Sequence, residues 1–333
     1  MGKKDRESLD VYYRAQMVGR LWLDEGRRFI FQYNTEWVKR KGSISLSFSL
    51  PIRESAYEND AARPYFSNLL PESGVRRMIT RRLGISEQND FALLREIGGE
   101  CAGAVSVFPS GTVPSEAPGY RRISKNELHR IMADIPKRPF LAGKKGIRLS
   151  LAGAQNKLPI YMEGSDVHIP TGSAPTTHIL KPPMPGFAGT VENEAFCMRL
   201  AAHMDLSVPE TSILDDHDRL YLVKRYDRIR DQEGKVLRFH QEDFCQALGF
   251  LSEQKYESEG GPTLAGCFDL LKKASIRPAA DQKSLIRWVA FNIFIGNADA
   301  HAKNLSILYT PRGPVLAPFY DLISTRVYPE ISG

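Results

Sequence analysis

Polar residues whose types and spacing suit phosphoryl transfer lie near the C-terminal end of the chain. Residues 297–304 read N-A-D-A-H-A-K-N, so four residues separate Asp299 from Asn304, and Asp321 follows in F-Y-D-L. In enzymes that transfer phosphoryl groups, an Asp and an Asn at this spacing orient the attacking hydroxyl and bind magnesium, and a second Asp downstream completes the metal site. A solvated polar loop is the alternative interpretation, and the rest of the chain must decide between the two.

A loop of small residues before a predicted strand could hold phosphates. Residues 150–157 read S-L-A-G-A-Q-N-K. Small side chains let the backbone approach a phosphate, and Lys157 would add positive charge. The loop is not a Walker A motif, because G-x-x-x-x-G-K-[ST] occurs nowhere in the chain. An ordinary tight loop would have the same composition.

Three further segments could complete a nucleotide site. Lys181 ends the predicted strand T-H-I-L-K, where a kinase places its phosphate-pairing lysine. Glu192 and Glu194 open the next predicted helix, and one of them could form an ion pair with Lys181, although acidic residues also suit the helix dipole. Residues 222–226, L-V-K-R-Y, could form a hinge that presents backbone groups to an adenine edge, with Tyr226 as a flat wall. A surface lysine and a plain strand end are the alternatives.

The order of these segments favours a kinase. The chain presents a small-residue loop, a lysine strand, an acidic helix, a hinge, an Asp–Asn loop and a metal Asp in the order that a kinase fold requires. Six weak signals in the right order are far less expected by chance than any one of them. The sequence therefore predicts an α+β, bilobal protein-kinase-like fold, with a small α/β N-terminal subdomain and a helix-rich C-terminal lobe.

A stretch rich in Pro, Gly and Ser helps to divide the chain into three regions. Residues 110–118 are rich in Ser, Gly and Pro, which is typical of a linker. We expect the N-terminal subdomain at 1–118, the rest of the N-terminal lobe with the phosphate loop and hinge at 119–228, and the helical lobe with the catalytic and metal-binding loops at 229–333.

Residue periodicity predicts the elements within these regions. Residues 285–295 are apolar nearly all round, which predicts a buried helix. The predicted strands are residues 18–23, 29–33, 44–50, 98–108, 158–162, 167–169, 177–181, 220–223, 305–309 and 315–319, and the predicted helices lie within 66–82 and at 125–133, 191–204 and 285–295.

The composition narrows the class of protein. The 333 residues are 42% hydrophobic and 25% charged, as in ordinary globular proteins, and the net charge of +6 suits an anionic ligand such as ATP without selecting it. No long basic run and no recognisable reading helix is present, which places a nucleic-acid-binding module well behind a kinase. The four cysteines are far apart, so buried free thiols are expected. The charged N-terminus and the short apolar runs predict a cytoplasmic protein with no membrane partner.

The chain resembles the HipA-type serine/threonine kinase toxins of bacterial toxin–antitoxin modules along essentially its whole length. The N-terminal motifs that carry the resemblance are F-S-N-L-L-P-E-S (66–73) and G-G-E-C-A-G-A-V (98–105). The others are L-S-L-A-G-A-Q-N-K (149–157), A-P-T-T-H-I-L-K (174–181), E-N-E-A-F-C (192–197), V-K-R-Y-D-R (223–228), H-Q-E-D-F-C-Q (240–246), K-Y-E-S-E-G-G-P (255–262), I-G-N-A-D-A-H-A-K-N (295–304) and P-F-Y-D-L-I-S (318–324).

The resemblance implies a role for each site residue. Asp299 matches the catalytic aspartate, Asn304 and Asp321 match the Mg²⁺ ligands, and Ser150 matches the serine whose autophosphorylation switches such kinases off. A phosphate on Ser150 would repel ATP from the adjacent loop. The implied ATP-binding residues are Ala152, Gly153, Ala154, Gln155, Asn156, Lys157, Lys181, Lys224, Tyr226, His301 and Lys303.

The resemblance also implies partners. It predicts a helix-turn-helix antitoxin, contact with DNA only through that antitoxin, and a translation-related substrate such as an aminoacyl-tRNA synthetase. The alternative is a catalytically silent relative that binds its antitoxin and takes part in operon repression. Family members generally continue well past the metal aspartate, whereas this chain stops twelve residues after Asp321. We therefore expect an incomplete C-terminal lobe with exposed apolar surface.

Overall fold

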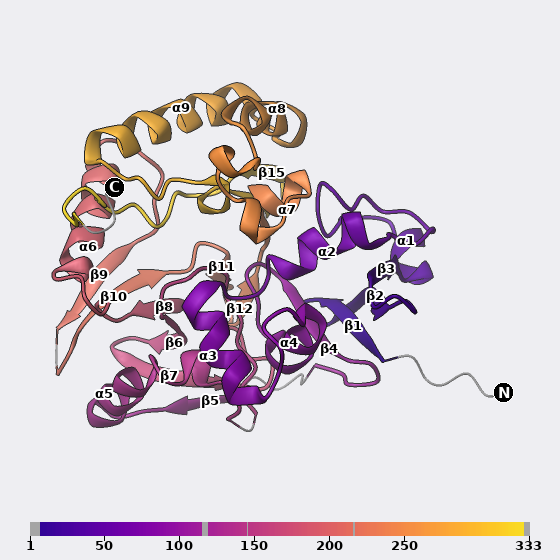
Figure 1. The fold of residues 1–333 in the computed structure, drawn as a ribbon, viewed down its shortest axis with the longest axis horizontal. Coiled ribbons are helices and arrows are strands. Elements are labelled where there is room, and N and C mark those ends of the chain that lie inside the picture. Colours follow the sequence, from indigo (N-terminus) through magenta and orange to yellow (C-terminus); the bar gives the residue numbers. More distant parts are fainter. Residues whose placement is uncertain (1–6, 115–118, 145, 216, 330–333) are drawn as a thin grey trace.

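Two apolar cores organise the chain in the computed structural model, which describes residues 7–114, 119–144, 146–215 and 217–329 (Figure 1). The cores meet at strands β8 (His178–Lys181) and β10 (Arg219–Lys224), which pair antiparallel. Successive side chains of a strand point to opposite faces, so Leu220 packs in the first core and Tyr221 in the second. Lys181, the buried last residue of β8, therefore lies where the two cores meet.

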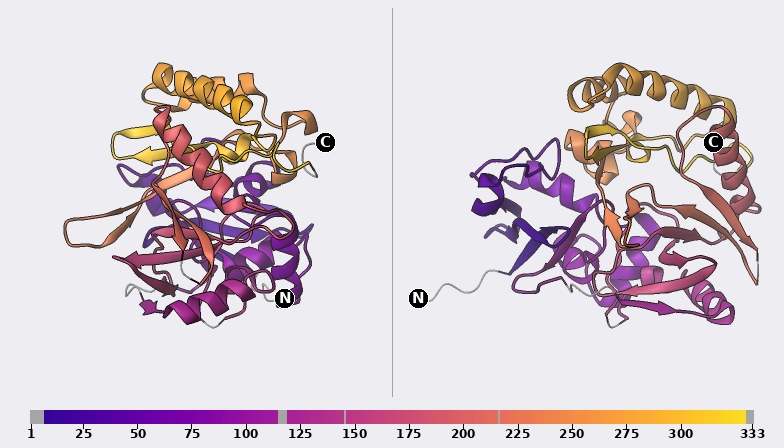
Figure 2. Two further views of the ribbon diagram at one scale, coloured as in Figure 1. Left: turned by 90° about the vertical axis from the view of Figure 1, so that its left-hand side faces the viewer. Right: turned by 180° about the vertical axis from the view of Figure 1, so that it is seen from behind.

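The N-terminal body is built on an antiparallel sheet with the strand order β3-β2-β1-β4. The predicted hairpin of residues 18–23 and 29–33 is confirmed as β2 paired with β3. Seen from behind, this sheet lies to one side of the molecule, while α8 and α9 lie across the top (Figure 2). The elements are β1 (Ser8–Tyr13), β2 (Gln16–Leu23), β3 (Phe29–Tyr33), β4 (Val105–Pro109), α1 (Thr35–Lys39), α2 (Asn59–Ser67), α3 (Ser73–Leu83) and α4 (Asp90–Ile97).

Of the strands predicted in this body, one is absent and another is shorter than expected. Residues 44–50 form no strand, because side chains accept hydrogen bonds from backbone amides that a strand would use for pairing. The amide of Leu46 donates to the Tyr33 hydroxyl, and the amide of Phe48 donates to the Glu242 side chain. Of residues 98–108, only the end belongs to β4. The preceding loop is folded tightly at Gly103 (φ +69°), where a Cβ would lie 2.7 Å from the Gln241 amide nitrogen.

The middle of the chain forms a six-stranded sheet with the order β5-β7-β6-β8-β10-β9. The predicted helix at 125–133 is confirmed, with the Ser124 hydroxyl accepting from the Glu127 amide as its N-cap. The remaining elements here are β5 (Gly119–Arg122), α5 (Lys125–Asp134), η1 (Pro139–Leu141), β6 (Leu158–Glu163), β7 (Asp166–Thr171), α6 (Thr190–His203) and β9 (Thr211–Asp215).

The C-terminal body places helices over a three-stranded sheet, β13-β14-β15, in which the predicted final hairpin is present. Part of the predicted linker, residues 115–118, lies outside the described residues. The elements are β11 (Arg228–Arg230), β12 (Val236–Arg238), β13 (His240–Asp243), α7 (Phe244–Leu248), η2 (Ser252–Gln254), η3 (Glu257–Glu259), α8 (Leu264–Ala274), α9 (Pro278–Ile295), η4 (Ala302–Asn304), β14 (Ser306–Thr310) and β15 (Gly313–Leu316).

The prediction that the apolar helix at 285–295 is buried is wrong for one side of α9. Leu285, Trp288 and Phe291 face the core, whereas Ile293 is 73% exposed and Phe294 is 81% exposed. The helix lies at the outer edge of the molecule (Figure 1), and among the described residues one of its sides is covered while the other is exposed. Apolar composition alone does not tell which sides of a helix are covered.

Two composition-based expectations can be compared with the structure. All four cysteines are free and buried, as expected. Across the described residues, no helix has the length and apolar character needed to cross a membrane.

Candidate active site

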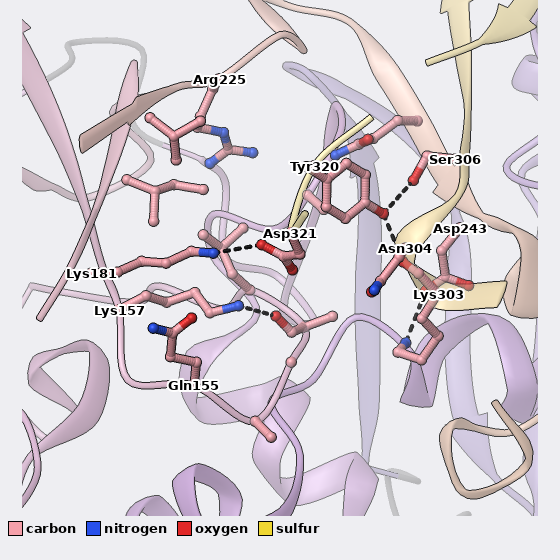
Figure 3. A pocket seen from close by; sticks show the side chains of 18 of the residues that line it. Gln155, Lys157, Lys181, Arg225, Asp243, Lys303, Asn304, Ser306, Tyr320 and Asp321 are labelled. Carbon is pink, nitrogen blue, oxygen red and sulfur yellow. Dashed lines mark hydrogen bonds and ion pairs between the residues drawn. The ribbon is translucent and has the colours of Figure 1, made fainter. Parts of the chain in front are cut away.

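A cavity of about 310 Å³ is lined by residues of the N-terminal body, the six-stranded sheet and the C-terminal body, and nearly all the sequence-predicted site residues line it (Figure 3). The exceptions are Asn156 and Ser150, which do not line the cavity. The lining residues among those predicted are Ala152, Gly153, Ala154, Gln155, Lys157, Lys181, Glu194, Lys224, Tyr226, Asp299, His301, Lys303, Asn304 and Asp321.

Lys181 is held between two acids at the end of β8. Its Nζ lies 2.7 Å from Glu194 Oε1. The same nitrogen lies 2.5 Å from Asp321 Oδ1 (Figure 3). Burial alone would lower the pKa of Lys181, but Asp321 and Glu194 raise it above its ordinary value. Burial alone would raise the pKa of Asp321, but Lys181 and Lys157 lower it to about 2. The lysine and Asp321 are therefore both charged at neutral pH.

The structure selects between the two glutamates that could pair with Lys181. Helix α6 starts after Gly189 (φ +70°) and buries the side of the helix that carries Val191 and Ala195, so Glu194 points into the molecule. Glu192 is 44% exposed and lies 3.2 Å from Arg219 instead. The partner of Lys181 is therefore Glu194, two positions further along the helix.

The loop at residues 151–157 folds around its own lysine. Lys157 Nζ donates to the Ala152 carbonyl at 2.6 Å (Figure 3). Gly153 has φ +108°, and a Cβ there would lie 2.7 Å from Lys157 Nζ, so both backbone conformation and space favour glycine. Ser150, just before the loop, is completely buried and donates its hydroxyl hydrogen to the Leu69 carbonyl at 2.7 Å.

The predicted hinge presents an aromatic wall, but two of its amides are already used. Tyr226 stacks on Tyr320 with ring centroids 5.9 Å apart and 26° between the ring planes. The amide of Lys224 donates to the Glu210 carbonyl and the amide of Arg225 donates to the Thr177 carbonyl. An adenine at this hinge would have to use other groups.

A buried ion cluster behind the hinge was not predicted from the sequence. Glu100, from the N-terminal body, accepts from the guanidinium groups of Arg225 (3.0 Å) and Arg228 (2.6 Å). Asp227 accepts from Arg225 at 2.8 Å and from the amide of Gly103, and its carboxylate is fully buried. The charged run R-Y-D-R reads as a solvated segment, and only the fold shows that its charges neutralise Glu100 inside the molecule.

The loop carrying Asp299 is fixed at both ends. It begins where α9 ends at Gly296, and the Asn297 side chain accepts from the Asp299 amide at 3.0 Å. The Asn304 side-chain amide donates to the Asp299 carbonyl at 2.9 Å, so its amide oxygen is the atom that would bind a metal. His301 Nε2 lies 3.6 Å from Asp299 Oδ1, while the Asp299 side chain itself is 54% exposed.

Tyr256 is a second residue that sequence reasoning missed. Its hydroxyl donates to Asp299 Oδ1, and its ring packs edge-on against His301. Tyr256 lies more than forty residues before Asp299 in the chain, so no local spacing in the segment K-Y-E-S-E-G-G-P indicated a contact between them. Only the fold brings the phenol to the carboxylate.

The residues present fit a nucleotide-bound magnesium ion. The described part of the chain holds no group of three or more His, Cys, Asp or Glu side chains that could bind a metal by themselves. Mg²⁺ usually takes one or two protein oxygens and completes its shell with phosphates and water. Asp321 and Asn304 supply two such oxygens in the same cavity.

Comparisons with known proteins show which family this chain resembles. Residues 9–108 match the family model of the HipA N-terminal domain, and residues 149–332 match that of the HipA-like C-terminal domain. The chain is 46% identical to the Y4mE protein of Sinorhizobium fredii over 97% of this chain and 79% of that protein. It is 32% identical to the serine/threonine-protein kinase toxin HipA of Shewanella oneidensis, over 97% of this chain and 76% of the toxin.

A solved structure extends the likeness to three dimensions. The HipA chain in the complex of Shewanella oneidensis HipA, HipB and operator DNA superposes with a TM-score of 0.81 at 31% identity, over 97% of this chain and 78% of that one. The predicted α+β kinase-like fold class is thereby confirmed. Both domain matches, the sequence identity and the superposition lead to one conclusion: the chain belongs to the HipA family.

Proposed function

We propose that this chain is an ATP- and magnesium-dependent serine/threonine protein kinase that acts as the toxin of a toxin–antitoxin module. The observation that supports this most is the placement of Lys181, bound to Glu194 and Asp321, in the same cavity as Asp299 and Asn304. Three acids, a lysine and an amide from separate segments converge there. This is the set of groups that phosphoryl transfer requires.

Each group has a chemical task in this proposal. Asp299 accepts the proton of the substrate hydroxyl, and Lys181 binds phosphate oxygens. Asn304 and Asp321 would hold the magnesium ion, which neutralises the charge of the phosphates when bound. Because the Tyr256 hydroxyl occupies one oxygen of Asp299, a substrate hydroxyl would use the other oxygen or replace the phenol.

The cavity suggests how ATP would lie. Tyr226 would stack against the adenine, and the triphosphate would run toward Lys157 and Lys181, whose ammonium groups lie in the same cavity. Because the amides of Lys224 and Arg225 are used by other carbonyls, the adenine would bind carbonyl oxygens of the hinge or the backbone of Tyr226. His301 and Lys303 line the same cavity and are further ATP-binding candidates.

The regulation and partners that we propose follow the family. Ser150 would be the autophosphorylation site that inactivates the enzyme, and its complete burial means that the loop must move before the hydroxyl can react. The structure of the Shewanella oneidensis relative contains HipB and operator DNA. We therefore propose a helix-turn-helix antitoxin as partner, DNA contact through it, a cytoplasmic location and a translation-related substrate such as an aminoacyl-tRNA synthetase.

Phosphate transfer from γ-labelled ATP tests the proposal. The acceptors are the chain itself and the proteins of a heat-treated bacterial lysate. We expect the wild-type chain to label protein, and Asp299→Asn to reduce labelling by about 10²–10⁴-fold, the usual contribution of a general base. Asp269→Asn removes an exposed carboxylate on α8 and should change nothing.

The same assay decides the alternative function. A wild-type chain that binds ATP but labels no protein would indicate the catalytically silent relative that binds its antitoxin. Equal labelling by the wild type and Asp299→Asn would remove Asp299 from the role of base.

A further inference from the structure

Residues 68–72, N-L-L-P-E, connect α2 to α3 in the N-terminal body and lie against the cavity, which Asn68, Leu69 and Glu72 line. The sequence indicated no role for this segment beyond family likeness. In the structure it is nearly completely buried and contacts both loops that the proposed function depends on.

The first set of contacts reaches the loop at residues 151–157. The Glu72 amide donates to the Gly153 carbonyl at 3.2 Å, and Pro71 and Gly153 form an isolated parallel bridge. The Leu69 carbonyl accepts the hydroxyl hydrogen of Ser150 at 2.7 Å. The phosphate loop is therefore held from outside at its beginning and at its glycine.

The second set of contacts reaches the loop at residues 297–304. Asn68 Oδ1 accepts from Lys303 Nζ at 2.5 Å, and Glu72 Oε1 lies 3.6 Å from the same nitrogen. Lys303 also donates to Asp243 at 2.8 Å, so its ammonium group is surrounded by protein oxygens. This lysine is fixed by residues 68–72 as much as by its own body.

A third contact links the segment to the neighbours of Asp299. Glu72 Oε2 accepts from Lys255 Nζ at 3.2 Å. The Lys255 carbonyl accepts from the Ala302 amide, and the next residue, Tyr256, donates to Asp299. Burial alone would raise the pKa of Glu72, but Lys303 and Lys255 lower it, so its carboxylate is charged at neutral pH.

We propose that residues 68–72 are a positioning segment which fixes the phosphate loop relative to the catalytic loop, with Glu72 as its central residue. The N-terminal body is then a component of the nucleotide site and not only a module beside it. One consequence rests on the proposed function: ATP affinity and phosphate transfer should depend on Glu72. The coupling between the loops itself does not require ATP.

The test compares Glu72→Gln with Asp90→Asn. Asp90 is a matched control because it is also a buried carboxylate of the N-terminal body, paired with Arg63 and Arg76, and it does not line the cavity. In the protein without nucleotide, hydrogen exchange is followed at the amides of residues 72 and 302, which donate to Gly153 and Lys255. We expect Glu72→Gln to accelerate both by roughly tenfold, and Asp90→Asn to leave both unchanged.

ATP titration and steady-state kinetics give the second readout. Glu72→Gln should weaken ATP affinity by about five- to twentyfold, and it should lower kcat as well, because it loosens both loops. Asp90→Asn should change neither the ATP affinity nor kcat, even if it lowers the urea midpoint. Unchanged exchange and affinity in Glu72→Gln, or equal changes in Asp90→Asn, would overturn the proposal. Should the wild type bind no ATP, the proposed function fails, and hydrogen exchange alone decides the coupling.

A second variant covers the case in which Glu72→Gln does not fold. Lys255→Gln removes the same ion pair from the other side, at a residue whose side chain reaches solvent. It should accelerate exchange at residue 302, and unchanged exchange there would contradict the proposal. Where Glu72→Gln does fold, the double variant should show less than the sum of the two single effects. Additive effects would show that the two residues act separately.

Discussion

At the scale of single residues, the site depends on charges that are buried but paired. Lys181 and Glu194 each expose only 5% of their side chains, and a buried charge without a partner would cost several kcal/mol. The pairing keeps the ammonium group charged and aimed at the cavity before any nucleotide arrives. Positioning of this kind is what phosphoryl transfer needs most.

Replacing the two neighbouring glutamates tests this positioning. Glu194→Gln should reduce kcat/KM for phosphate transfer by roughly ten- to a hundredfold, because a charge-assisted hydrogen bond to Lys181 is lost. Glu192→Gln is the matched control on the same helix, since its side chain is exposed and pairs with Arg219. Steady-state kinetics measure both. A larger loss of kcat/KM in Glu192→Gln than in Glu194→Gln would mean that Glu194 is not the partner of Lys181 in solution.

Ser150 gives a second residue-scale prediction. Incubation with Mg-ATP should add one phosphate to Ser150, as detected by mass spectrometry, and ATP affinity should fall by about tenfold or more because the added charge lies beside the phosphate loop. Ser150→Ala removes one hydrogen bond, to Leu69, so its ATP affinity should fall far less than that of the phosphorylated protein, and it should gain no phosphate. Phosphate found only at other residues of an active protein would exclude this site.

At the scale of elements, contacts between segments distant in sequence decide the local structure. Residues 44–50 alternate as a strand does, yet they form a loop because Glu242 and Tyr33 satisfy their backbone groups. The hinge likewise is held by Glu100 from the N-terminal body. In both cases a buried acid of one segment orders the backbone or charges of another.

Removal of the Glu100 charge should destabilise the protein strongly. Glu100→Gln leaves Asp227 as the remaining described carboxylate that pairs with Arg225 and Arg228, and breaking such a cluster costs about 3–5 kcal/mol. Glu96→Gln changes an exposed glutamate nearby, paired with Arg95, and should cost less than about 0.5 kcal/mol. Urea unfolding measures both. Similar midpoints for the two variants would contradict the role of the cluster.

The pH dependence of stability tests the contact between residues 44–50 and Glu242. Burial raises the pKa of Glu242 to about 7, although Ser47, Tyr309 and the Phe48 amide donate to it. The folded state therefore keeps a proton that the unfolded state loses above its ordinary pKa of 4.5. Stability should fall as pH rises from about 4.5 to 7, by on the order of 3 kcal/mol, and stay level above that.

Urea unfolding between pH 5 and pH 8 measures this effect. Glu242→Gln cannot titrate, so the part of the slope due to this residue should vanish in the variant. The same slope in the variant and in the wild type would show that Glu242 titrates normally in the folded protein.

At the scale of the whole molecule, the order of the motifs along the chain predicted the fold and the site better than any single predicted helix or strand did. The spacing of Asp299, Asn304 and Asp321 alone left a solvated polar loop possible. The order of all the segments, which a kinase fold fixes, was needed to expect these residues in one site. The outward side of α9 and the roles of Glu72, Glu100 and Tyr256 were not predictable. They depend on which segments meet in space, and neither periodicity nor local spacing records that.

The most direct test of the central claim is a titration of ATP at fixed magnesium against the wild type, Asp299→Asn and Asp321→Asn. We predict saturable binding by the wild type, nearly unchanged affinity in Asp299→Asn, and much weaker affinity in Asp321→Asn, because the base contacts the substrate hydroxyl whereas the metal carboxylate holds the ion that bridges the phosphates. Absence of binding by the wild type, or a greater loss in Asp299→Asn than in Asp321→Asn, would contradict the account.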